Sequence, residues 1–260
     1  MNRLESLVQL KRQNGQKILA MFLTAGYPRK TDTFDQVIAL ERGGVDIIEL
    51  GMPFSDPLAD GPVIQESSSV ALKNGVTLSS IFTEVMRIRR RSQIPIVLMG
   101  YLNPILHYGE EEFFDQAASS GVDGIILPEV PLEEYDRFAA HIQRYALSGI
   151  LMVAPTTPPE RISQIDRRSR GFVYCVSSTG VTGKKSGTPA TEYLESVRRN
   201  VTNNAVLVGF GISTPEEARQ VVWSADGVIV GSALIRYLAT NPSLQELTAW
   251  AGGFRTLLNL

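Results

Sequence analysis

Two acidic side chains stand at the end of an apolar run, within the segment ELGMPFSDPLADG at residues 49–61. Glu49 lies two residues after Ile47, so an extended chain points both side chains to the same face. A carboxyl group beside apolar walls has a raised pKa and can act as both general acid and general base. Asp60 follows on a loop stiffened by prolines, which suits a side chain that must be held in place. Asp56, on the same loop, competes for that role.

The type of these residues does not by itself tie them to a reaction. Glu49 could be a structural glutamate, and Asp60 could cap a helix that begins at Pro62. Both alternatives remain open until the surrounding elements are considered.

The other reactive side chains give little support to different chemistry. His107 and His141 are 34 residues apart with no ligand spacing around them, so the sequence predicts no metal site. Cys175 follows Tyr174 in an apolar run, so the two side chains face opposite sides, and we interpret the cysteine as a buried structural thiol. No lysine lies within a predicted strand, which leaves a Schiff-base mechanism without an obvious residue.

Two glycine-rich turns predict a phosphate site. The first, GFGISTPEE at 209–217, precedes a helix whose N-cap is Ser213 or Thr214. The second, GSALI at 231–235, opens another helix. Glycines let backbone N–H groups approach an anion, and a helix N-terminus favours negative charge. The alternative is that both segments are ordinary turns at helix starts.

The segment SSTGVTGKKSGTP at 177–189 has about 13 residues, which is long for a connection between a strand and a helix. It contains three glycines and a single apolar residue, Val181. Long connections of this kind are often lids, and the alternative is a disordered loop without function. The stretch Gly180–Gly183 could add backbone donors to the phosphate site.

These residues sit at the ends of short apolar runs that alternate with longer helical patterns. Continuous apolar runs bracketed by helices predict a parallel sheet covered by helices. The runs are Ile18–Leu23, Asp46–Leu50, Ile96–Gly100, Gly124–Leu127, Ile150–Val153, Phe172–Val176, Ala205–Val208 and Val228–Val230.

Three of the runs share one plan, in GGVDIIELG (43–51), SGVDGIILPEV (120–130) and SADGVIVGS (224–232). In each, a small residue ends a helix, an aspartate turns the chain and a buried strand follows, which supports repeated βα units. Eight strands in about 230 residues, without a linker, predict an α/β fold with one closed (β/α)8 TIM barrel. We expect this barrel to form a single domain over residues 1–260. An open doubly wound sheet would carry a glycine-rich fingerprint after its first strand, where this chain reads TAGYP.

Composition limits the cellular compartment and the kinds of partner that we expect for the chain. Its 260 residues carry one cysteine and a net charge of −2. A single cysteine excludes an intramolecular disulfide framework and fits a reducing compartment such as the cytoplasm, and the charge gives no case for nucleic acid. No apolar run approaches the roughly 20 residues needed to span a bilayer. The N-terminus lacks the apolar core of a signal peptide, and Leu4, Leu7 and Val8 are spaced for an extra N-terminal amphipathic helix.

Three clusters of arginines, at Arg87–Arg91, Arg167–Arg170 and Arg198–Arg199, each close a helical segment just before a predicted strand. Cations in the last turn complement the helix dipole. We therefore interpret the clusters as helix C-termini and not as a surface for nucleic acid.

Six motifs, in this order, closely resemble the tryptophan synthase α subunit family. They are MFLTAGYP (21–28), ELGMPFSDPLADGPVIQ (49–65), MGYLNP (99–104), GVTG (180–183), GFGIS (209–213) and GSA (231–233). The likeness covers nearly the whole chain. It implies a (β/α)8 barrel that cleaves indole-3-glycerol phosphate to indole and glyceraldehyde 3-phosphate, a retro-aldol lyase reaction in tryptophan biosynthesis.

The resemblance also implies roles for the matching residues. Glu49 is similar to the general acid and base, Asp60 to the group that holds the indole N–H, and Tyr174 to a tyrosine that supports the site. The residues that match the indole pocket and the lid are Phe22, Tyr101, Ile126, Phe210 and Thr182, and those that match the phosphate cradle are Gly183, Gly211, Gly231 and Ser232.

A partner is implied as well. The β subunit of the family carries pyridoxal phosphate and consumes the indole in an allosteric α2β2 heterotetramer, while the α subunit is implied to use neither metal nor organic cofactor. The residues that match the partner-facing surface are Pro53, Phe54, Asp56, Pro57, Asn103 and Pro104. Two positions depart from the family pattern: Met52 replaces the commoner Val, Ile or Phe, and Glu129 stands where Asp is usual.

Two other functions would share part of the pattern. A different phosphate-binding barrel, such as an isomerase or epimerase of phosphosugars, would share the glycine-rich turns but would not require Asp60 within PFSDPLADGP. An allosteric module that only activates a β partner would not need Glu49, Asp60 and Thr182 to be present together.

Overall fold

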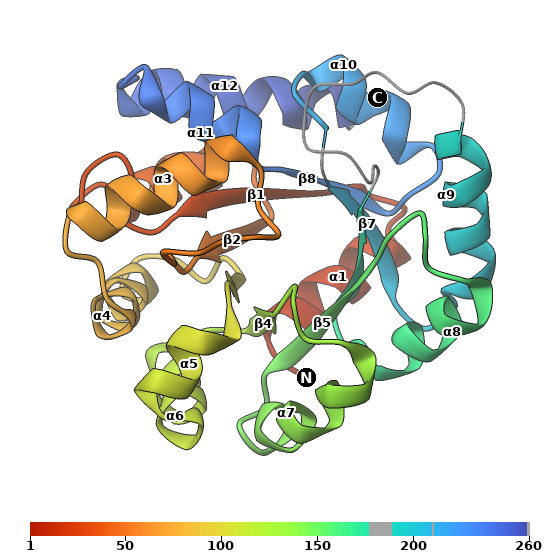
Figure 1. Cartoon of the computed structure of the whole chain (residues 1–260). Helices are drawn as coiled ribbons and strands as arrows, with labels where there is room; N and C mark the ends of the chain where they lie inside the picture. Colours follow the sequence, from red (N-terminus) through yellow and green to blue (C-terminus); the bar gives the residue numbers. More distant parts are fainter. Residues whose placement is uncertain (177–188, 210, 259–260) are drawn as a thin grey trace.

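The computed structural model describes residues 1–176, 189–209 and 211–258. The described residues form eight parallel strands that close into a barrel in the order β1 to β8, with the helices outside (Figure 1). The strands are β1 (Ile18–Thr24), β2 (Ile47–Gly51), β3 (Ile96–Met99), β4 (Gly124–Ile126), β5 (Ser148–Val153), β6 (Phe172–Val176), β7 (Ala205–Gly209) and β8 (Gly227–Val230).

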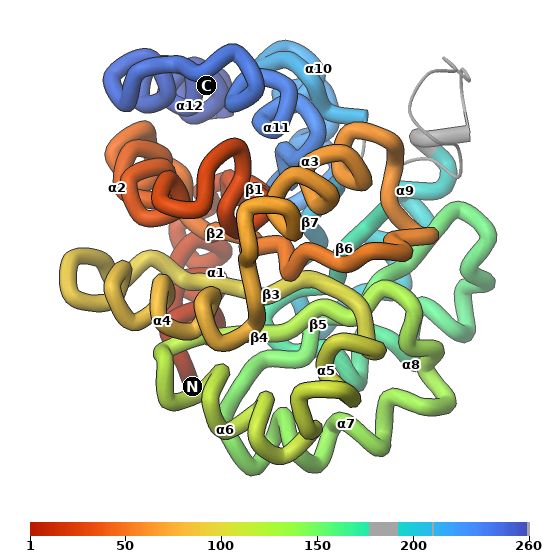
Figure 2. The backbone as a smooth tube through the Cα atoms, turned by 60° about the vertical axis from the view of Figure 1, so that its left-hand side comes forward, coloured from red at the N-terminus to blue at the C-terminus, as the bar shows by residue number. Residues whose placement is uncertain are grey.

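One or two helices follow each strand along the chain. They are α1 (Arg3–Gln13), α2 (Thr33–Arg42), α3 (Pro62–Lys73), α4 (Leu78–Arg89), α5 (Leu102–Tyr108), α6 (Glu110–Ser120), α7 (Leu132–Arg144), α8 (Pro159–Arg168), α9 (Pro189–Asn200), α10 (Pro215–Val222), α11 (Ser232–Ala239) and α12 (Leu244–Leu258). Figure 2 shows α2 and α12 side by side at one side of the barrel. The predicted TIM barrel is therefore confirmed.

The strands are buried on both faces, which explains their continuous apolar runs. One face of each strand fills the barrel interior. The register pairs Ala20 with Ile47 and Phe22 with Glu49, so these side chains share the interior face. The interior is therefore apolar up to the level of Glu49, near the C-terminal ends of the strands.

The aspartates of the three repeated segments make the same contact at the N-terminal ends of the strands. Each aspartate donates its backbone N–H to a carbonyl of the preceding strand, and its side chain accepts the N–H of that same residue. The pairs are Asp46 with Leu19 (2.8 and 2.9 Å), Asp123 with Ile96 (2.8 and 2.9 Å) and Asp226 with Val206 (2.9 and 2.8 Å). The aspartate thus continues the hydrogen-bond ladder of its neighbour before its own strand begins.

The predicted N-terminal helix, α1, packs across this end of the barrel. Asn2 caps it by accepting the N–H of Glu5, and the Asn2 side chain also donates to Asp123 O at 2.8 Å and Ser148 Oγ at 2.9 Å. Leu4 and Val8 are buried. The helix therefore covers the N-terminal ends of β4 and β5.

The three arginine clusters occupy the helix ends that the sequence predicted. Arg87 and Arg89 lie in the last turn of α4, and the last turns of α8 and α9 are basic as well. Arg89 also pairs with Asp123 at 2.8 Å, which ties α4 to the base of the barrel. Among the helices that the structure describes, none is long and apolar enough to cross a membrane.

Candidate active site

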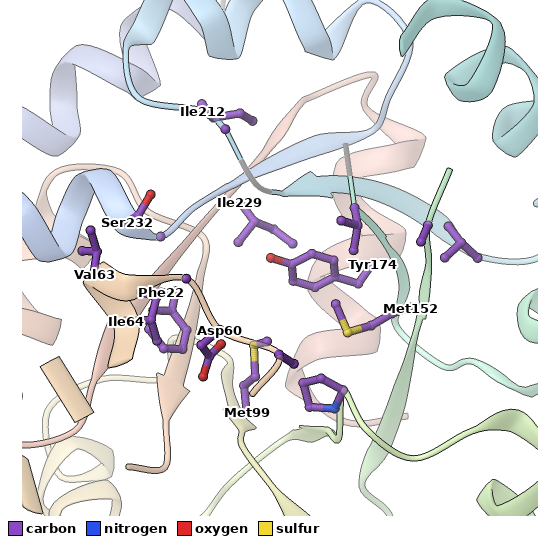
Figure 3. Close-up of a pocket in the computed structure, with 18 of the residues that line it drawn as sticks. Phe22, Asp60, Val63, Ile64, Met99, Met152, Tyr174, Ile212, Ile229 and Ser232 are labelled. Atoms are coloured by element: carbon purple, nitrogen blue, oxygen red, sulfur yellow. The ribbon is translucent and has the colours of Figure 1, made fainter. Parts of the chain in front are cut away.

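A cavity of about 580 Å³ opens at the C-terminal ends of the strands. Figure 3 shows Asp60 near Phe22 and Met99, and Tyr174 near Met152 and Ile229, around the same space. Its lining comes from several strand ends and from the loop between β2 and α3. The lining residues are Phe22, Leu58, Ala59, Asp60, Gly61, Val63, Ile64, Met99, Pro128, Met152, Val153, Ala154, Thr157, Tyr174, Val176, Gly211, Ile212, Ile229, Gly231 and Ser232.

Glu49 lies in the barrel interior, next to Phe22 in the register, and is 0% exposed. Neither carboxylate oxygen receives a hydrogen bond from the residues that the structure describes. Burial without a partner raises the pKa of Glu49 to about 8, so the side chain is mainly protonated at neutral pH. Glu49 is not itself a lining residue of the cavity, whereas its neighbour Phe22 is.

Asp60 stands at the mouth of the cavity on the loop between β2 and α3. Its Oδ2 accepts a hydrogen bond from the Tyr101 hydroxyl at 3.1 Å, and that hydroxyl accepts the N–H of Ala59 at 3.0 Å. Burial raises the pKa of Asp60 to about 6, against the opposing effect of the hydrogen bond from Tyr101. Asp60 therefore remains mainly ionised at neutral pH although it is largely covered.

The structure separates Asp60 from the two alternatives that the sequence left open. The N-cap of α3 is Gly61, without a side-chain hydrogen bond, so the interpretation of Asp60 as a helix cap is wrong. Asp56 is exposed, accepts a hydrogen bond from Ser55 and does not line the cavity. Of the two aspartates, only Asp60 faces the space where a ligand would bind.

Tyr174 lies across the cavity from Asp60, and Figure 3 shows its hydroxyl pointing into the space between them. Burial raises the pKa of Tyr174 well above its usual value, and the nearby Glu49 and Asp60 carboxyl groups act in the same direction. The hydroxyl therefore stays protonated at neutral pH.

Two glycines leave room for the rings that line the cavity. A Cβ at Gly51 would lie 2.5 Å from Phe22 Cζ, and a Cβ at Gly209 would lie 2.3 Å from the Tyr174 hydroxyl. Because a side chain at either position would displace the ring, these glycines fix where Phe22 and Tyr174 can lie.

The glycine-rich ends of β7 and β8 meet at one end of the cavity. Gly211, which has a φ of +80°, lines it together with Gly231 and Ser232. α11 begins at Ser232, and Gly231 provides no side-chain cap, so the first N–H groups of this helix have no capping side chain. The helix dipole and these N–H groups make this end suitable for an anion.

The turn before α10 shows which of Ser213 and Thr214 is the N-cap of the helix. Thr214 is the N-cap, and it forms a capping box with Glu217, whose Oε2 also accepts the N–H of Ser213 at 2.7 Å. This arrangement orders the chain directly after Gly211.

Three predicted site residues, Thr182, Gly183 and Phe210, lie outside the described residues, as does most of the predicted lid at 177–189.

Two further predicted site residues lie close to the cavity without lining it. Ile126 is 0% exposed in β4, and Tyr101 reaches the site through its hydroxyl bond to Asp60. The sequence analysis missed Met99, Pro128 and Met152, which lie at the ends of three strands and line the cavity. The sequence could have indicated these three residues by their position at the ends of predicted strands.

The residues predicted to face a partner lie beside the cavity mouth. Phe54 stacks near Tyr101, with ring centroids 5.3 Å apart, while Asp56 and Asn103 are exposed and Pro53 and Pro57 are buried. Leu58, on the same loop, is 91% exposed, the most exposed large apolar side chain among the described residues.

Both positions that depart from the family pattern have defined contacts. Glu129 accepts the N–H of Leu102 at the start of α5. Met52 is buried and packs against Gly100. Both contacts lie at the start of α5, the helix that contains Asn103 and Pro104.

The remaining reactive residues lie away from the cavity. Cys175 is buried and faces Tyr193, with Sγ 3.4 Å from the hydroxyl. Burial raises the pKa of this thiol to about 11, as expected for a buried structural cysteine. Within the described ranges, no group of three or more His, Cys, Asp or Glu side chains could hold a metal ion.

Comparison with known proteins gives one consistent result. The family model described as tryptophan synthase alpha chain matches residues 7–251. A tryptophan synthase alpha chain from Geobacter sulfurreducens is 48% identical over 238 residues, which is 91% of this chain and 90% of that protein.

Solved structures agree with this result. The tryptophan synthase subunit alpha from Legionella pneumophila has a TM-score of 0.87 and 35% identity, covering 99% of this chain and 98% of that one. A structure of Mycobacterium tuberculosis tryptophan synthase has a TM-score of 0.90 and 36% identity, covering 100% of this chain and 99% of that one.

Proposed function

The chain belongs to the tryptophan synthase alpha chain family, lyases that cleave indole-3-glycerol phosphate and pass indole to a β subunit, and we propose that Glu49, Asp60 and Tyr174 carry this reaction here. The observation that supports this assignment most strongly is the contrast between the two carboxyl groups. Glu49 has a pKa of about 8 and Asp60 a pKa of about 6, so one is an acid and the other a carboxylate at neutral pH.

The cavity orients the substrate by its two ends. The phosphate binds at the end formed by Gly211, Gly231 and Ser232, where backbone N–H groups of α11 favour an anion. The indole ring packs between the apolar side chains, with its N–H directed at Asp60. The reacting carbon between ring and phosphate then lies in the middle of the cavity, above Glu49.

Carbon–carbon cleavage requires a leaving group, and indole is a poor one as a carbanion. Protonated Glu49 gives its proton to ring carbon C3, and the positive charge spreads to N1. The Asp60 carboxylate accepts the N1–H and stabilises the charge where it develops. Tyr101 holds Asp60 in place through the 3.1 Å hydrogen bond.

The second proton transfer completes the reaction. Glu49, now a carboxylate, removes the proton from the hydroxyl on the carbon attached to C3. The C3–carbon bond breaks, its electron pair returns to the ring to give indole, and the hydroxyl carbon becomes the aldehyde of glyceraldehyde 3-phosphate. Glu49 ends protonated as it began. The steps call for one acid–base group and one carboxylate, so none of them requires a metal or organic cofactor.

Glu49 reaches the substrate by rotating about its side-chain bonds, because it lies beneath the lining residues in the unliganded chain. The absence of a hydrogen-bond partner among the described residues favours this movement, since no bond has to be broken. The Tyr174 hydroxyl stands at the same level of the barrel and supports the rotated carboxyl group.

The test is release of indole from indole-3-glycerol phosphate. The variant Glu49→Gln keeps the shape of the side chain and removes its proton chemistry, and Glu112→Gln, exposed on α6, is the matched control. We expect the control to retain activity and Glu49→Gln to lose it. Full activity in folded Glu49→Gln would reject the assignment.

We further propose that the surface of Pro53, Phe54, Asp56, Pro57, Asn103 and Pro104 docks the β subunit. The apolar Leu58 and the half-exposed Phe54 support this, because exposed apolar side chains around a site mark a contact surface. A cognate β subunit should raise indole release by the wild type and raise it less in Leu58→Ser. Equal stimulation of both would remove Leu58 from the interface.

A further inference from the structure

The segment ELGMPFSDPLADGPVIQ (49–65) ends at Gln65, a residue that the proposed reaction leaves without a role. Gln65 lies near the start of α3, is exposed and does not line the active-site cavity. Its side chain turns back to the loop between β2 and α3. The Nε2 atom donates to Asp60 O at 2.9 Å and lies 3.5 Å from Pro57 O, at the limit of a hydrogen bond. The Gln65 amide therefore reaches both ends of the turn that carries Asp60.

The hydrogen bond from Gln65 completes a set of contacts around Asp60. Asp60 donates its backbone N–H to Pro57 O at 3.0 Å, and its Oδ2 accepts the Tyr101 hydroxyl at 3.1 Å. The Asp60 carbonyl lies before the hydrogen-bond ladder of α3, because the first carbonyl that the helix uses is that of Gly61. Since Gln65 bonds to the Asp60 carbonyl, both peptide groups beside the Asp60 Cα are held. The direction of the Asp60 side chain then depends on Gln65 as well as on Tyr101.

Gln65 belongs to a helix that is itself fixed to the barrel. α3 packs against β1 (Figure 1). Ser67 on α3 is 0% exposed, and its hydroxyl oxygen lies 2.7 Å from that of Thr24 at the end of β1. The loop before α3 belongs to no helix or strand, since β2 ends at Gly51 and α3 begins at Pro62. Gln65 therefore joins a loop without regular secondary structure to a fixed helix.

We propose that Gln65 is a positioning residue for the Asp60 carboxylate. This inference rests on the role proposed above for Asp60, the carboxylate that receives the indole N–H. Gln65 acts through the Asp60 backbone, and a carboxylate that is displaced stabilises a developing charge less well. Loss of the Gln65 bond therefore slows the chemical step. The phosphate end of the cavity, formed by Gly211, Gly231 and Ser232, involves no bond to Gln65, so substrate binding changes less.

The experiment uses Gln65→Met, which keeps the length of the side chain and a good helix former and removes both amide donors. Indole release by the full chain with a cognate β subunit is measured over a range of substrate concentrations. We expect kcat to fall about fivefold, the effect of one hydrogen bond, and KM to change by less than about twofold. Gln143→Met, which replaces an exposed glutamine on α7, is the matched control and should keep both constants.

A double-mutant cycle with Asp60→Asn separates positioning from a general loosening of the barrel. Because Gln65 acts through Asp60, Gln65→Met should lower kcat by less than about twofold when Asp60→Asn is already present. An equal fall in both backgrounds would overturn the proposal, since Gln65 would then act independently of Asp60.

The single variants distinguish failure of this inference from failure of its premise. Full activity in folded Asp60→Asn would reject the role proposed for Asp60, and the inference about Gln65 with it. Reduced kcat in Asp60→Asn together with wild-type kcat in Gln65→Met would reject the positioning role alone. Gln65 is exposed, so we expect Gln65→Met to fold as the wild type does, which circular dichroism checks.

Discussion

The two ends of the barrel surround their acidic side chains differently. At the N-terminal ends of the strands, Asp46, Asp123 and Asp226 each bond to a neighbouring strand, and Asp46 and Asp123 also pair with cations. At the C-terminal ends, Glu49 has no hydrogen-bond partner among the described residues, and burial raises its pKa to about 8.

Asp166 makes the contrast sharper. It is 2% exposed and accepts the backbone N–H groups of Thr202, Asn203 and Asn204. Burial alone would raise the pKa of Asp166, but the hydrogen bonds that it accepts outweigh this effect and lower it. One end of the fold thus uses carboxylates to hold the chain together. At the other end, the described residues give the Glu49 carboxyl group no hydrogen bond, which suits the acid–base role that we propose for it.

The largest expected effect is on catalysis, at the C-terminal end of the barrel. Glu49→Gln should lower kcat for indole release by about a thousandfold, because it removes both the proton donor and the base. Steady-state assays with saturating substrate, in the presence of a β subunit, give the number. A fall of less than tenfold would mean that another group moves the protons.

The same variant should remain folded and become more resistant to denaturant at alkaline pH. Folded Glu49 keeps its proton up to about pH 8, whereas unfolded glutamate loses it near 4.5, so the wild type loses unfolding free energy as pH rises between these values. Glu49→Gln lacks that loss, which amounts to about 4 kcal/mol by pH 8. Urea unfolding at pH 5 and pH 8 measures the difference.

The second prediction concerns stability, at the N-terminal end of the barrel. Asp166→Ala should cost about 3 kcal/mol of unfolding free energy, because it leaves several buried N–H groups without an acceptor. Urea denaturation measures this loss, and kcat of the folded fraction should stay within about twofold of wild type. A large fall in kcat at unchanged stability would contradict the division between the two ends.

The third prediction concerns pH. kcat/KM should rise as pH increases through about 6, where Asp60 loses its proton, and fall above about 8, where Glu49 loses its own. Outside these limits the rate should change about tenfold per pH unit. A profile that stays flat between pH 5 and pH 9, measured with a pH-independent coupling assay, would show that these carboxyl groups do not control the reaction.

The smallest expected effect on activity tests whether Tyr101 influences the ionisation of Asp60. Tyr101→Phe removes the hydrogen bond that lowers the pKa of Asp60, so the acidic limb of the pH profile should move to higher pH. At pH 8 the loss in kcat/KM should be about tenfold, consistent with the loss of one hydrogen bond to a carboxylate. An acidic limb that does not move would separate Tyr101 from the ionisation of Asp60.

The sequence was enough to predict nearly all of the fold, because each strand consists mainly of apolar residues. The main difference is at β5, which begins at Ser148 and not at Ile150. Ser148 and Gly149 pair with Gly124 and Ile125, yet neither residue is apolar, so the strand start was hidden. Asp46 was included in a strand but lies just before β2, where it bonds to Leu19.

The sequence was enough to predict many residues of the candidate site, but not how their side chains are arranged. Alternation along β2 was enough to direct Glu49 inward, but nothing in the sequence indicated that its carboxyl group lies beneath the cavity lining without a partner among the described residues. The choice between Asp56 and Asp60 depended on Tyr101, which is distant in sequence and reaches Asp60 only in the folded barrel. Long-range contacts of this kind are set by packing and leave no local signal.

The most direct test of this account is the titration of Glu49 itself. The chain is labelled with ¹³C at glutamate side-chain carboxyl carbons, and the Glu49 signal is assigned by its absence in Glu49→Gln. The account predicts a midpoint near pH 8 in the unliganded wild type. A midpoint near 4.5, the ordinary value for glutamate, would show that Glu49 is ionised and solvated at neutral pH, and would contradict both the proposed acid and the contrast between the two ends.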